Sequence, residues 1–364
     1  MFVEKLKLFQ FRNIRSGEYH FPEQISFIVG DNGQGKSNLI EAISFLSCGR
    51  SFRTSTVRDL VAWEAEACSV FSQVIGNHGS FDIGMMLEGG RRKAFINGNK
   101  VPSMAEYIGE LTSVTFAPSD MALIQGAPSF RRNFLDKHLV DVNPKIFQSL
   151  TTYNRALQHR NALLKQGERS RALYRPFEEI LARDALIILR EKNKFIEALD
   201  EKSERYYQEL SQGKDGQLKQ SLVTNVTETP DPQKIVEQFD QFFEKDFHSQ
   251  STQLGHHRDD IKVLLGGHEA RSFASQGQTR SIVLSMKLAV LELIEEQRGD
   301  SPVLLLDDIE SELDRGRMEK LLQILFRRER QVILTGTELA TRELFEDHGY
   351  HVFSIQQGDV KALK

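Results

Sequence analysis

The sequence predicts an α/β protein with mixed sheets and an inserted helical arm domain, and three observations support this. Strand-like patterns, either alternating or wholly apolar, fill much of the first 120 residues and return after about residue 255. Between them, residues 177–210 contain neither glycine nor proline and repeat apolar side chains at three- and four-residue steps. We therefore expect a discontinuous head of residues 1–142 and 255–364, with a helical arm and linker at 143–254.

The bulk composition is that of a soluble, cytoplasmic protein. The chain has 364 residues, of which 40% are hydrophobic and 27% charged, enough for one large core or two domains. No apolar stretch is long enough to span a bilayer, and residues 1–11 lack the apolar region of a signal peptide. Cys48 and Cys68 cannot form a disulfide framework, which favours a reducing compartment. The net charge of −4 argues against indiscriminate coating of nucleic acid, although not against a local basic surface.

Several short strands are predicted in the first third of the chain. Residues 5–11 alternate, residues 25–29 form an apolar run before a glycine, and residues 81–87 and 94–96 continue the β-pattern. Asn97-Gly98 then predicts a tight hairpin turn, because a type I′ turn requires positive φ at both central residues.

The middle of the chain predicts an antiparallel pair of long helices. Residues 177–210 would form a helix roughly 50 Å long. Residues 147–165 can be its partner, with Gln166-Gly167 beginning the turn between them. The alternative is two ordinary core helices of a single domain. Residues 214–232 are polar and interrupted by glycine and proline, so we expect a linker or loop there.

An alternation of helices and strands returns near the end of the chain. Residues 278–297 predict an amphipathic helix that Gly299 terminates. An apolar strand at 303–306, a helix at 315–328 and strands at 332–335 and 351–355 follow.

The segment from Gly30 to Ser37 contains the strongest motif. Its Gly-x-x-x-x-Gly-Lys-Ser pattern, with a strand before and a helix after, predicts a loop whose backbone N–H groups converge on phosphate oxygens. Lys36 would act on the β- and γ-phosphates of ATP, and the Ser37 hydroxyl would bind Mg²⁺. The alternative is a glycine-rich turn with a chance lysine. The residues expected to bind the nucleotide here are Gly30, Asp31, Asn32, Gly33, Gln34, Gly35, Lys36, Ser37 and Asn38.

Two carboxylates follow the apolar strand at 303–306. Asp307 would hold Mg²⁺, directly or through water, and Asp308 would orient the attacking water as a catalytic residue together with Lys36. Because apolar runs before two acids are common at strand ends, this interpretation depends on the phosphate loop.

A third motif, Ser275-Gln276-Gly277-Gln278, precedes the helix predicted at 278–297. Locally, Ser275 and Gln278 form a capping box. The functional interpretation is that Ser275, Gly277 and the exposed first-turn amides bind the phosphates of a nucleotide held elsewhere. Both can hold at once.

The order of these three motifs resembles that of the ABC ATPase class, in which Ser-x-Gly-Gln is the signature motif. The helical insertion between residues 30 and 275 resembles the DNA-repair branch of that class, with the chromosome-scaffold (SMC) ATPases. Further motifs extend the likeness over nearly the whole chain, to the bacterial RecF family of recombination-repair proteins. These motifs are Phe11-Arg12-Asn13-Ile14, Gly49-Arg50-Ser51-Phe52-Arg53, Arg131-Arg132-x-Phe134-Leu135-Asp136 and Ser311-Glu312-Leu313-Asp314.

The resemblance implies a head domain with a short arm that dimerises when it binds ATP. Ser275 of one subunit would complete the site that Lys36 and Asp307 form in the other. Arg12 and Asn13 would contact the nucleotide, and residues 311–314 would form the D-loop of the interface. The implied role is ATP-dependent binding of gapped DNA or of junctions between single- and double-stranded DNA. With RecR and RecO, it would help to place RecA on single-stranded DNA in repair, replication-fork maintenance and the SOS response.

Some residues depart from the pattern of the class. Asp308 stands where transporters have glutamate, residues 116–120 lack the glutamine of a Q-loop, and Thr335-Gly336-Thr337 carries no histidine switch. We therefore expect a slow ATPase in which ATP acts as a switch.

Three basic clusters are candidates for DNA contact, although solvated or salt-bridged faces are the simpler interpretation. They are Arg91-Arg92-Lys93, Arg131-Arg132, and Arg327-Arg328 with Arg330. Competing functions are an ABC-class repair nuclease, a structural DNA-bridging protein of the SMC type and a transporter subunit. A nuclease needs a metal site, for which residues 256–260 (His-His-Arg-Asp-Asp) are the nearest candidate. A polar loop is the simpler interpretation, because consecutive residues cannot easily converge on one metal.

Overall fold

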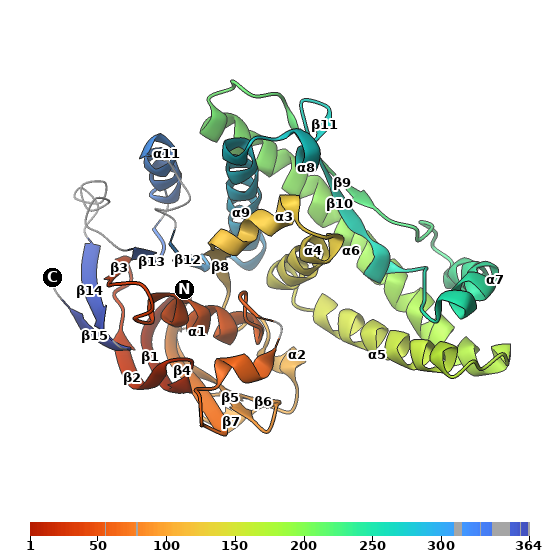
Figure 1. Cartoon of the computed structure of the whole chain (residues 1–364), viewed down its shortest axis with the longest axis horizontal. Coiled ribbons are helices and arrows are strands. Elements are labelled where there is room, and N and C mark those ends of the chain that lie inside the picture. The colour runs from red at the N-terminus through yellow and green to blue at the C-terminus, as the bar shows by residue number, and fades with distance from the viewer. Residues whose placement is uncertain are drawn as a thin grey trace.

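Three β-sheets and a set of long helices make up the protein (Figure 1). The structure is a computed structural model that describes residues 1–54, 56–77, 79–308, 315–327, 329–336, 350–356 and 358–362. The two large sheets gather at one end, and helices α5 (Ile146–Lys165), α6 (Arg171–Ser211) and α7 (Pro232–Ser249) extend away from them, with the small third sheet beside α6. The α/β class with mixed sheets, predicted from the sequence, is confirmed.

Sheet A is antiparallel and comes entirely from the first 100 residues. In β1, the buried residues Val3, Leu6 and Leu8 face the core, while Lys7 and Phe9 lie on the other face. Asn97 and Gly98 have φ of 49° and 76°, so the predicted hairpin turn is confirmed. In spatial order the strands are β2 (Ile14–His20), β1 (Phe2–Phe11), β4 (Ala67–Gly76), β5 (Gly79–Glu88), β6 (Arg91–Ile96) and β7 (Asn99–Lys100).

Sheet B combines strands from both ends of the chain. Its central strands are parallel, and β15 pairs antiparallel with β14 at one edge. The carboxyl ends of parallel strands meet at one edge of a sheet, where open α/β sheets bind their ligands. The order is β15 (Asp359–Ala362), β14 (Tyr350–Gln356), β3 (Ile25–Val29), β13 (Val332–Gly336), β12 (Val303–Leu306) and β8 (Ser113–Phe116).

Helix α1 (Lys36–Cys48) follows β3 directly and packs between the two large sheets. Its residues Leu39, Ile40 and Ile43 are fully buried, so the helix that carries the phosphate loop is anchored in the core. The shorter helices are η1 (Val57–Leu60), α2 (Met104–Tyr107), η2 (Pro118–Met121), α3 (Ala122–Gln125), α4 (Pro128–Val142), η3 (His256–Arg258), α8 (Ala270–Phe273) and α11 (Arg315–Leu325).

Helices α5 (Ile146–Lys165) and α6 (Arg171–Ser211) form the predicted antiparallel pair. Gly167, with φ of 71°, lies in the turn between them. Helix α6 begins six residues before the predicted start and includes Pro176, and its 41 residues span about 60 Å. Helix α7 (Pro232–Ser249) packs against α6, and Asp231 caps it by accepting from the N–H of Gln233.

The prediction of a linker or loop at 214–232 is wrong in part. Residues Leu218–Val223 form strand β9, which pairs with β10 (Asp260–Leu265) in a small sheet completed by β11 (His268–Glu269). Gln220 is buried in β9 and donates to the Ser203 hydroxyl, so a polar residue occupies a position that faces the core.

Helix α9 (Gln276–Arg298) lies between α6, α4 and β8 and is buried along most of its length. Residues 281–295 are buried on every face, so the expected amphipathic helix is instead a core helix. Gly299, with φ of 68°, ends it as predicted. Among the residues that the structure describes, no helix is long and apolar enough to cross a membrane.

Candidate nucleotide-binding site

The phosphate-loop motif lies between β3 and α1, as the sequence predicts. Gly33 and Gly35 adopt φ of 81° and 112°, values that side chains rarely allow. Gly35 occupies the N-cap position of α1, and no side chain caps the helix there. The first-turn N–H groups of α1 therefore face the loop, which is the arrangement that binds anions at a helix N-terminus.

Neighbouring segments explain why two of the glycines are needed. A Cβ atom on Gly30 would lie 2.6 Å from the carbonyl oxygen of Ile355 in β14. A Cβ atom on Gly35 would lie 3.1 Å from Oδ1 of Asn13. The loop is thus fixed by β14 on one side and by the β1–β2 turn on the other.

Lys36 is the first residue of α1, and its ammonium group folds back into the loop. The side chain is 8% exposed. It donates to the carbonyl oxygens of Gly30 and, at 3.1 Å, Asp31. Asp31, Asn32 and Gly33 form the exposed outer part of the loop. A positive charge is therefore held inside the ring of amides where the phosphates of a nucleotide would lie.

Asp307 lies at the same edge of sheet B, directly after β12. One strand, β13, separates β12 from β3, so the carboxylate and the phosphate loop face each other across β13. Oδ1 of Asp307 accepts from the Thr335 hydroxyl at 2.9 Å. Burial raises the pKa of Asp307, and hydrogen bonding from the Ser37 and Thr335 hydroxyls opposes that rise. The structure therefore brings Ser37 and Asp307, the two predicted metal ligands, together.

Asp308, the second predicted acid, lies beside Asp307 in an uncommon backbone conformation. Its φ is 50°, in the left-handed region that aspartate tolerates better than most residues. The N–H of Asp308 donates to the Thr335 hydroxyl at 3.0 Å, so one threonine fixes both acids. Such strain, held by neighbouring bonds, is common at functional sites.

The β1–β2 turn brings Asn13 against the phosphate loop. Nδ2 of Asn13 donates to the carbonyl oxygen of Gly33 at 3.2 Å, and Oδ1 accepts from Nδ2 of Asn38 at 2.7 Å. Asn13, Gly33 and Asn38, all predicted nucleotide contacts, thus form one connected group.

Arg12 is held by a residue that sequence reasoning missed. Its guanidinium donates to both carboxylate oxygens of Glu41, at 2.8 and 2.6 Å, and Glu41 is fully buried on α1. Arg53 reaches the same carboxylate at 3.4 Å and Oδ1 of Asn38 at 2.7 Å. The motif Gly49–Arg53 therefore contributes a second guanidinium near the phosphate loop. The only sequence signal for this contact was the resemblance of that motif to the RecF family.

The Ser275 motif forms the predicted capping box at the start of α9. The Ser275 hydroxyl accepts from the N–H of Gln278 at 3.2 Å, and Oε1 of Gln278 accepts from the N–H of Ser275 at 2.8 Å. Ser275 is exposed, and Gly277 leaves room for the Arg317 guanidinium. Figure 1 places α8, which leads into α9, apart from β3 and α1. The Ser275 motif and the phosphate loop of one chain are therefore separate sites.

Residues 116–120, which stand where a Q-loop is expected, are held by a hydrogen bond within the segment and by an ion pair to α9. Asp120 accepts from the N–H of Ala117 at 2.7 Å and pairs with Lys287 of α9 at 2.6 Å. The predicted D-loop, residues 311–314, lies outside the described residues, as does Thr337.

Both residues of the Arg131-Arg132 cluster form hydrogen bonds within the protein. Arg131 is 6% exposed and binds both carboxylate oxygens of Asp260, at 2.6 and 2.9 Å. Arg132 donates to the carbonyl oxygen of Asp259 at 3.1 Å. The salt-bridged interpretation therefore applies to Arg131, because this buried guanidinium joins α4 to β10.

The other two basic clusters are also largely paired. Arg327 binds Glu209 of α6, and Arg330 lies 3.3 Å from Glu295, while Arg328 falls outside the described residues. Lys93 pairs with Glu88. The ion-paired interpretation therefore holds for four of the cationic side chains proposed for DNA contact, Lys93, Arg131, Arg327 and Arg330.

The candidate metal cluster at residues 256–260 is divided among other partners. His257 lies 2.9 Å from the Tyr153 hydroxyl, and Asp259 pairs with the buried Lys192 at 3.0 Å. Burial lowers the pKa of His257 to about 4. Within the described ranges, no three His, Cys, Asp or Glu side chains are arranged to hold a metal ion.

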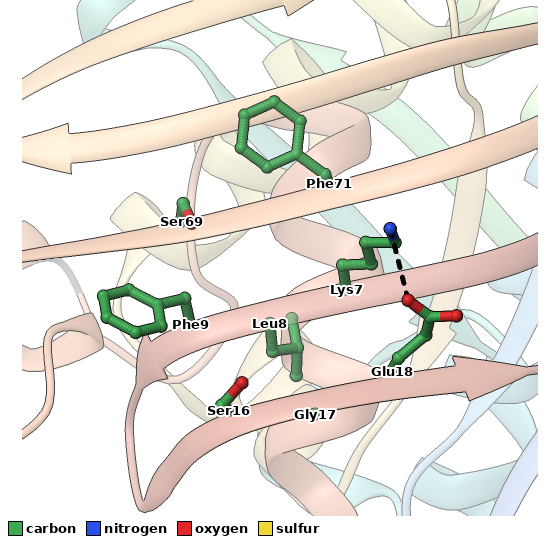
Figure 2. A pocket seen from close by; sticks show the side chains of 8 residues that line it. All are labelled: Lys7, Leu8, Phe9, Ser16, Gly17, Glu18, Ser69 and Phe71. Atoms are coloured by element: carbon green, nitrogen blue, oxygen red, sulfur yellow. Dashed lines mark ion pairs between the residues drawn. The ribbon is translucent and has the colours of Figure 1, made fainter.

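A hollow of about 340 Å³ lies on sheet A, lined by residues of β1, β2 and β4 (Figure 2). Glu18 pairs there with Lys7 at 3.2 Å and with the nearby Lys5 at 2.6 Å, and these lysines lower its pKa to about 2. None of the predicted site residues contributes to the hollow. Its lining residues are Lys7, Leu8, Phe9, Ser16, Gly17, Glu18, Ser69 and Phe71.

Comparison with known proteins places this site in a family. A sequence model of the RecF/RecN/SMC N terminal domain matches residues 2–361. The chain is 34% identical over 364 residues to the DNA replication and repair protein RecF of Streptococcus pyogenes serotype M5 (strain Manfredo), covering 99% of this chain and 98% of that one. The chain belongs to the RecF family. The RecF of Clostridium novyi (strain NT) is likewise 34% identical and covers 99% of both chains.

Solved structures of the RecF family share the whole fold. A structure of the recombination mediator protein RecF-ATP in the RecFOR pathway superposes with a TM-score of 0.89 at 32% identity, covering 100% of this chain and 97% of that one. An SMC head bound to the C-winged helix domain of ScpA reaches a TM-score of 0.56 at 17% identity, which shows a shared fold. The resemblance to the RecF family predicted from the sequence motifs is confirmed.

Proposed function

We propose that the chain is an ATP-dependent DNA-binding protein of recombinational repair and replication-fork maintenance. ATP would drive its dimerisation, and the dimer would recognise gapped or junction DNA. The observation that carries this proposal is the meeting of Lys36, Ser37 and Asp307 at one edge of sheet B. The similarity to the RecF-ATP structure supports ATP as the nucleotide.

The residues at the sheet edge suit ATP together with Mg²⁺. Ser37 and Asp307 offer a hydroxyl and a carboxylate, the hard oxygen ligands that Mg²⁺ prefers. We propose that they hold the ion, which would neutralise charge on the phosphates. Lys36 and the first-turn amides of α1 would bind the phosphate oxygens, and Asp308 would orient water.

The Ser275 motif supports a dimer, because it lies apart from the phosphate loop of its own chain. The start of α9 offers N–H groups and an exposed hydroxyl, and among the described residues the phosphate loop between β3 and α1 lies elsewhere. In a symmetric pair, each start of α9 would cover the nucleotide held by the other subunit. In this proposal residues 1–142 and 255–364 form the head, and residues 143–254 form the arm.

The partners proposed for this dimer are those of the RecFOR pathway, to which the structurally similar RecF-ATP protein belongs. RecR and RecO would act with it to help load RecA on single-stranded DNA, and the dimer itself would bind single- and double-stranded DNA. The shorter reach of Asp308 favours slow hydrolysis, so ATP would act as a switch. A steady-state turnover on the order of hundreds per second without other factors would contradict this.

The dimer is tested by changing Ser275 without removing its cap. Aspartate and asparagine are both good N-cap residues, so both variants should keep α9 intact. Ser275→Asp places a negative charge where the partner's phosphates would lie, whereas Ser275→Asn does not. In sedimentation with ATP, with ADP and without nucleotide, we expect wild type and Ser275→Asn to dimerise only with ATP. We expect Ser275→Asp to remain monomeric.

The same samples should be sedimented with gapped DNA. Nucleotide-dependent binding of DNA by wild type, weakened in Ser275→Asp, is the expected result. ATP-dependent dimers of Ser275→Asp as stable as those of wild type would refute the shared site. DNA binding that is equal with and without ATP would refute the switch.

Asp307→Asn is expected to stabilise the nucleotide-free protein while impairing its function. Because burial raises the folded-state pKa of Asp307, the unfolded chain loses this proton at lower pH, and stability falls as the pH rises through both values. Asparagine carries no charge and removes this penalty. The thermal midpoint should rise by about 2 °C for each kcal/mol recovered. The gain in ATP affinity that Mg²⁺ produces should be lost.

Scanning calorimetry and ATP titration with and without Mg²⁺ measure both effects. Asp82→Asn, an exposed change on sheet A, is the matched control and should alter neither. An unchanged Mg²⁺ dependence in Asp307→Asn would remove Asp307 from the metal site.

A further inference from the structure

The side chain of Gln278 is bonded at both ends. Its Oε1 accepts from the N–H of Ser275 at 2.8 Å, which closes the capping box. Its Nε2 donates to Oδ1 of Asp215 at 2.9 Å. The glutamine therefore joins the turn at the start of α9 to a residue that is distant in the sequence.

Asp215 belongs to the short segment that follows α6. The helix ends at Ser211, and Gln212 and Gly213, with φ of 60° and 65°, reverse the chain toward the start of α9. The other carboxylate oxygen of Asp215 accepts from the hydroxyl of Tyr207 at 3.1 Å. Tyr207 lies on α6 and is fully buried, so the carboxylate is fixed to the helix itself.

The segment around Asp215 has little freedom to move. The N–H of Gly266 donates to the carbonyl oxygen of Gln217 at 2.9 Å. A Cβ atom on Gly216 would lie 2.6 Å from Cα of Gly266, so the two backbones are in close contact. The turn between β10 and β11 therefore holds the segment that carries Asp215.

Arg317 lies against the same turn from the side of α11. A Cβ atom on Gly277 would be 3.0 Å from one guanidinium nitrogen of Arg317. A cation beside an N-terminal helix turn strengthens the attraction of that turn for anions. The start of α9 thus has α6, through Asp215, on one side and the Arg317 cation on another.

Helix α6 also contacts α9 near its C-terminal end. Lys202 pairs with Glu292 at 3.1 Å and with Glu296 at 2.8 Å, and the Tyr206 hydroxyl donates to Glu292 at 2.6 Å. The same helix extends away from the sheets beside α5 (Figure 1). A movement of α6 would therefore be transmitted to α9 at both ends.

We propose that Asp215 is a positioning residue that fixes the Ser275–Gln278 turn to helix α6, so that dimerisation on ATP depends on the position of this helix. The proposal rests on the proposed function, because the turn would act on the nucleotide of a second copy of this chain. Asp215 touches no nucleotide. It holds Gln278, and Gln278 holds the N–H of Ser275 in its capped geometry.

The test compares Asp215→Ala with Asp215→Asn. The alanine variant loses a bond between a charged group and an amide, whereas asparagine can still accept from Gln278. We expect Asp215→Ala to raise the dissociation constant of the ATP-bound dimer about tenfold or more, measured by sedimentation over a concentration series. Asp215→Asn should recover most of this loss. ATP affinity, measured at protein concentrations below dimer formation, should stay within about twofold of wild type in both variants, since the phosphate loop is remote.

Tyr207→Phe provides a milder second variant, because it removes only the hydroxyl that holds Asp215. It should weaken the dimer less than Asp215→Ala, and thermal unfolding should show all three variants folded at the temperature of the assay. Equal dimer stability in wild type, Asp215→Ala and Tyr207→Phe would overturn the proposal and leave the ATP-dependent dimer intact. Absence of ATP-dependent dimers in wild type would instead refute the proposed function.

Discussion

Replacement of Lys36 by alanine is expected to weaken ATP binding by about 3 kcal/mol, roughly a 100-fold loss of affinity. The ammonium group lies inside the phosphate loop, where it now donates to the carbonyl oxygens of Gly30 and Asp31. Removing it would leave only the backbone amides and Mg²⁺ to balance the charge of the triphosphate. Isothermal titration with ATP and Mg²⁺ measures the loss directly.

Lys93→Ala is the matched control, because Lys93 is a cation of sheet A that pairs with Glu88. Its ATP affinity should equal that of wild type. If Lys36→Ala bound ATP within about twofold of wild type, the assignment of residues 30–37 as the phosphate site would be wrong.

Arg160→Met is expected to cost about 3–5 kcal/mol of folding free energy. Arg160 is fully buried on α5, where it bonds to the equally buried Glu178 at 3.1 Å and Asp246 at 2.7 Å. Methionine would leave Asp246 in the interior without its cation, while Glu178 would keep only its pair with the half-exposed Arg171. Burial already raises the pKa of Asp246, so ionisation of this group opposes folding above its ordinary pKa. The loss in the variant should therefore be larger at pH 8 than at pH 5.

Denaturant unfolding at the two pH values measures this loss. Arg169→Met is the control. Arg169 is exposed, and its ion pair with the equally exposed Glu244 is long, at 4.0 Å. It should change stability by less than about 0.5 kcal/mol. A cost below about 1 kcal/mol for Arg160→Met would show that the interior hydrates or rearranges around the two acids.

The features predicted well from the sequence depend on contiguous residues. The apolar run of β3 followed by residues 30–37, the strand that ends at Asp307, and the Ser275 capping box all carry their structural cause within a few positions. Backbone conformation at Asn97-Gly98 follows for the same reason. Local sterics and hydrogen bonding decide these elements, and tertiary packing does not overrule them.

The features that the sequence did not reveal depend on distant partners. Arg131 is a plausible surface cation until Asp260, far along the chain, is placed beside it. Glutamate on a helix is usually exposed, yet Glu41 is buried and forms ion pairs with Arg12 and Arg53. Strand β9 was hidden because Gln220, a polar residue, faces the core. Patterns of polarity cannot show which charges the tertiary fold will pair.

The position of β3 between β13 and β14 has a consequence for how the protein is made. The ribosome releases β3 and α1 early, but both neighbours of β3 come after residue 331. During synthesis, both edges of this mostly apolar strand stay unpaired while some 300 further residues are made. Because unpaired apolar strands aggregate readily, the nascent chain should need chaperone protection until the last strands arrive.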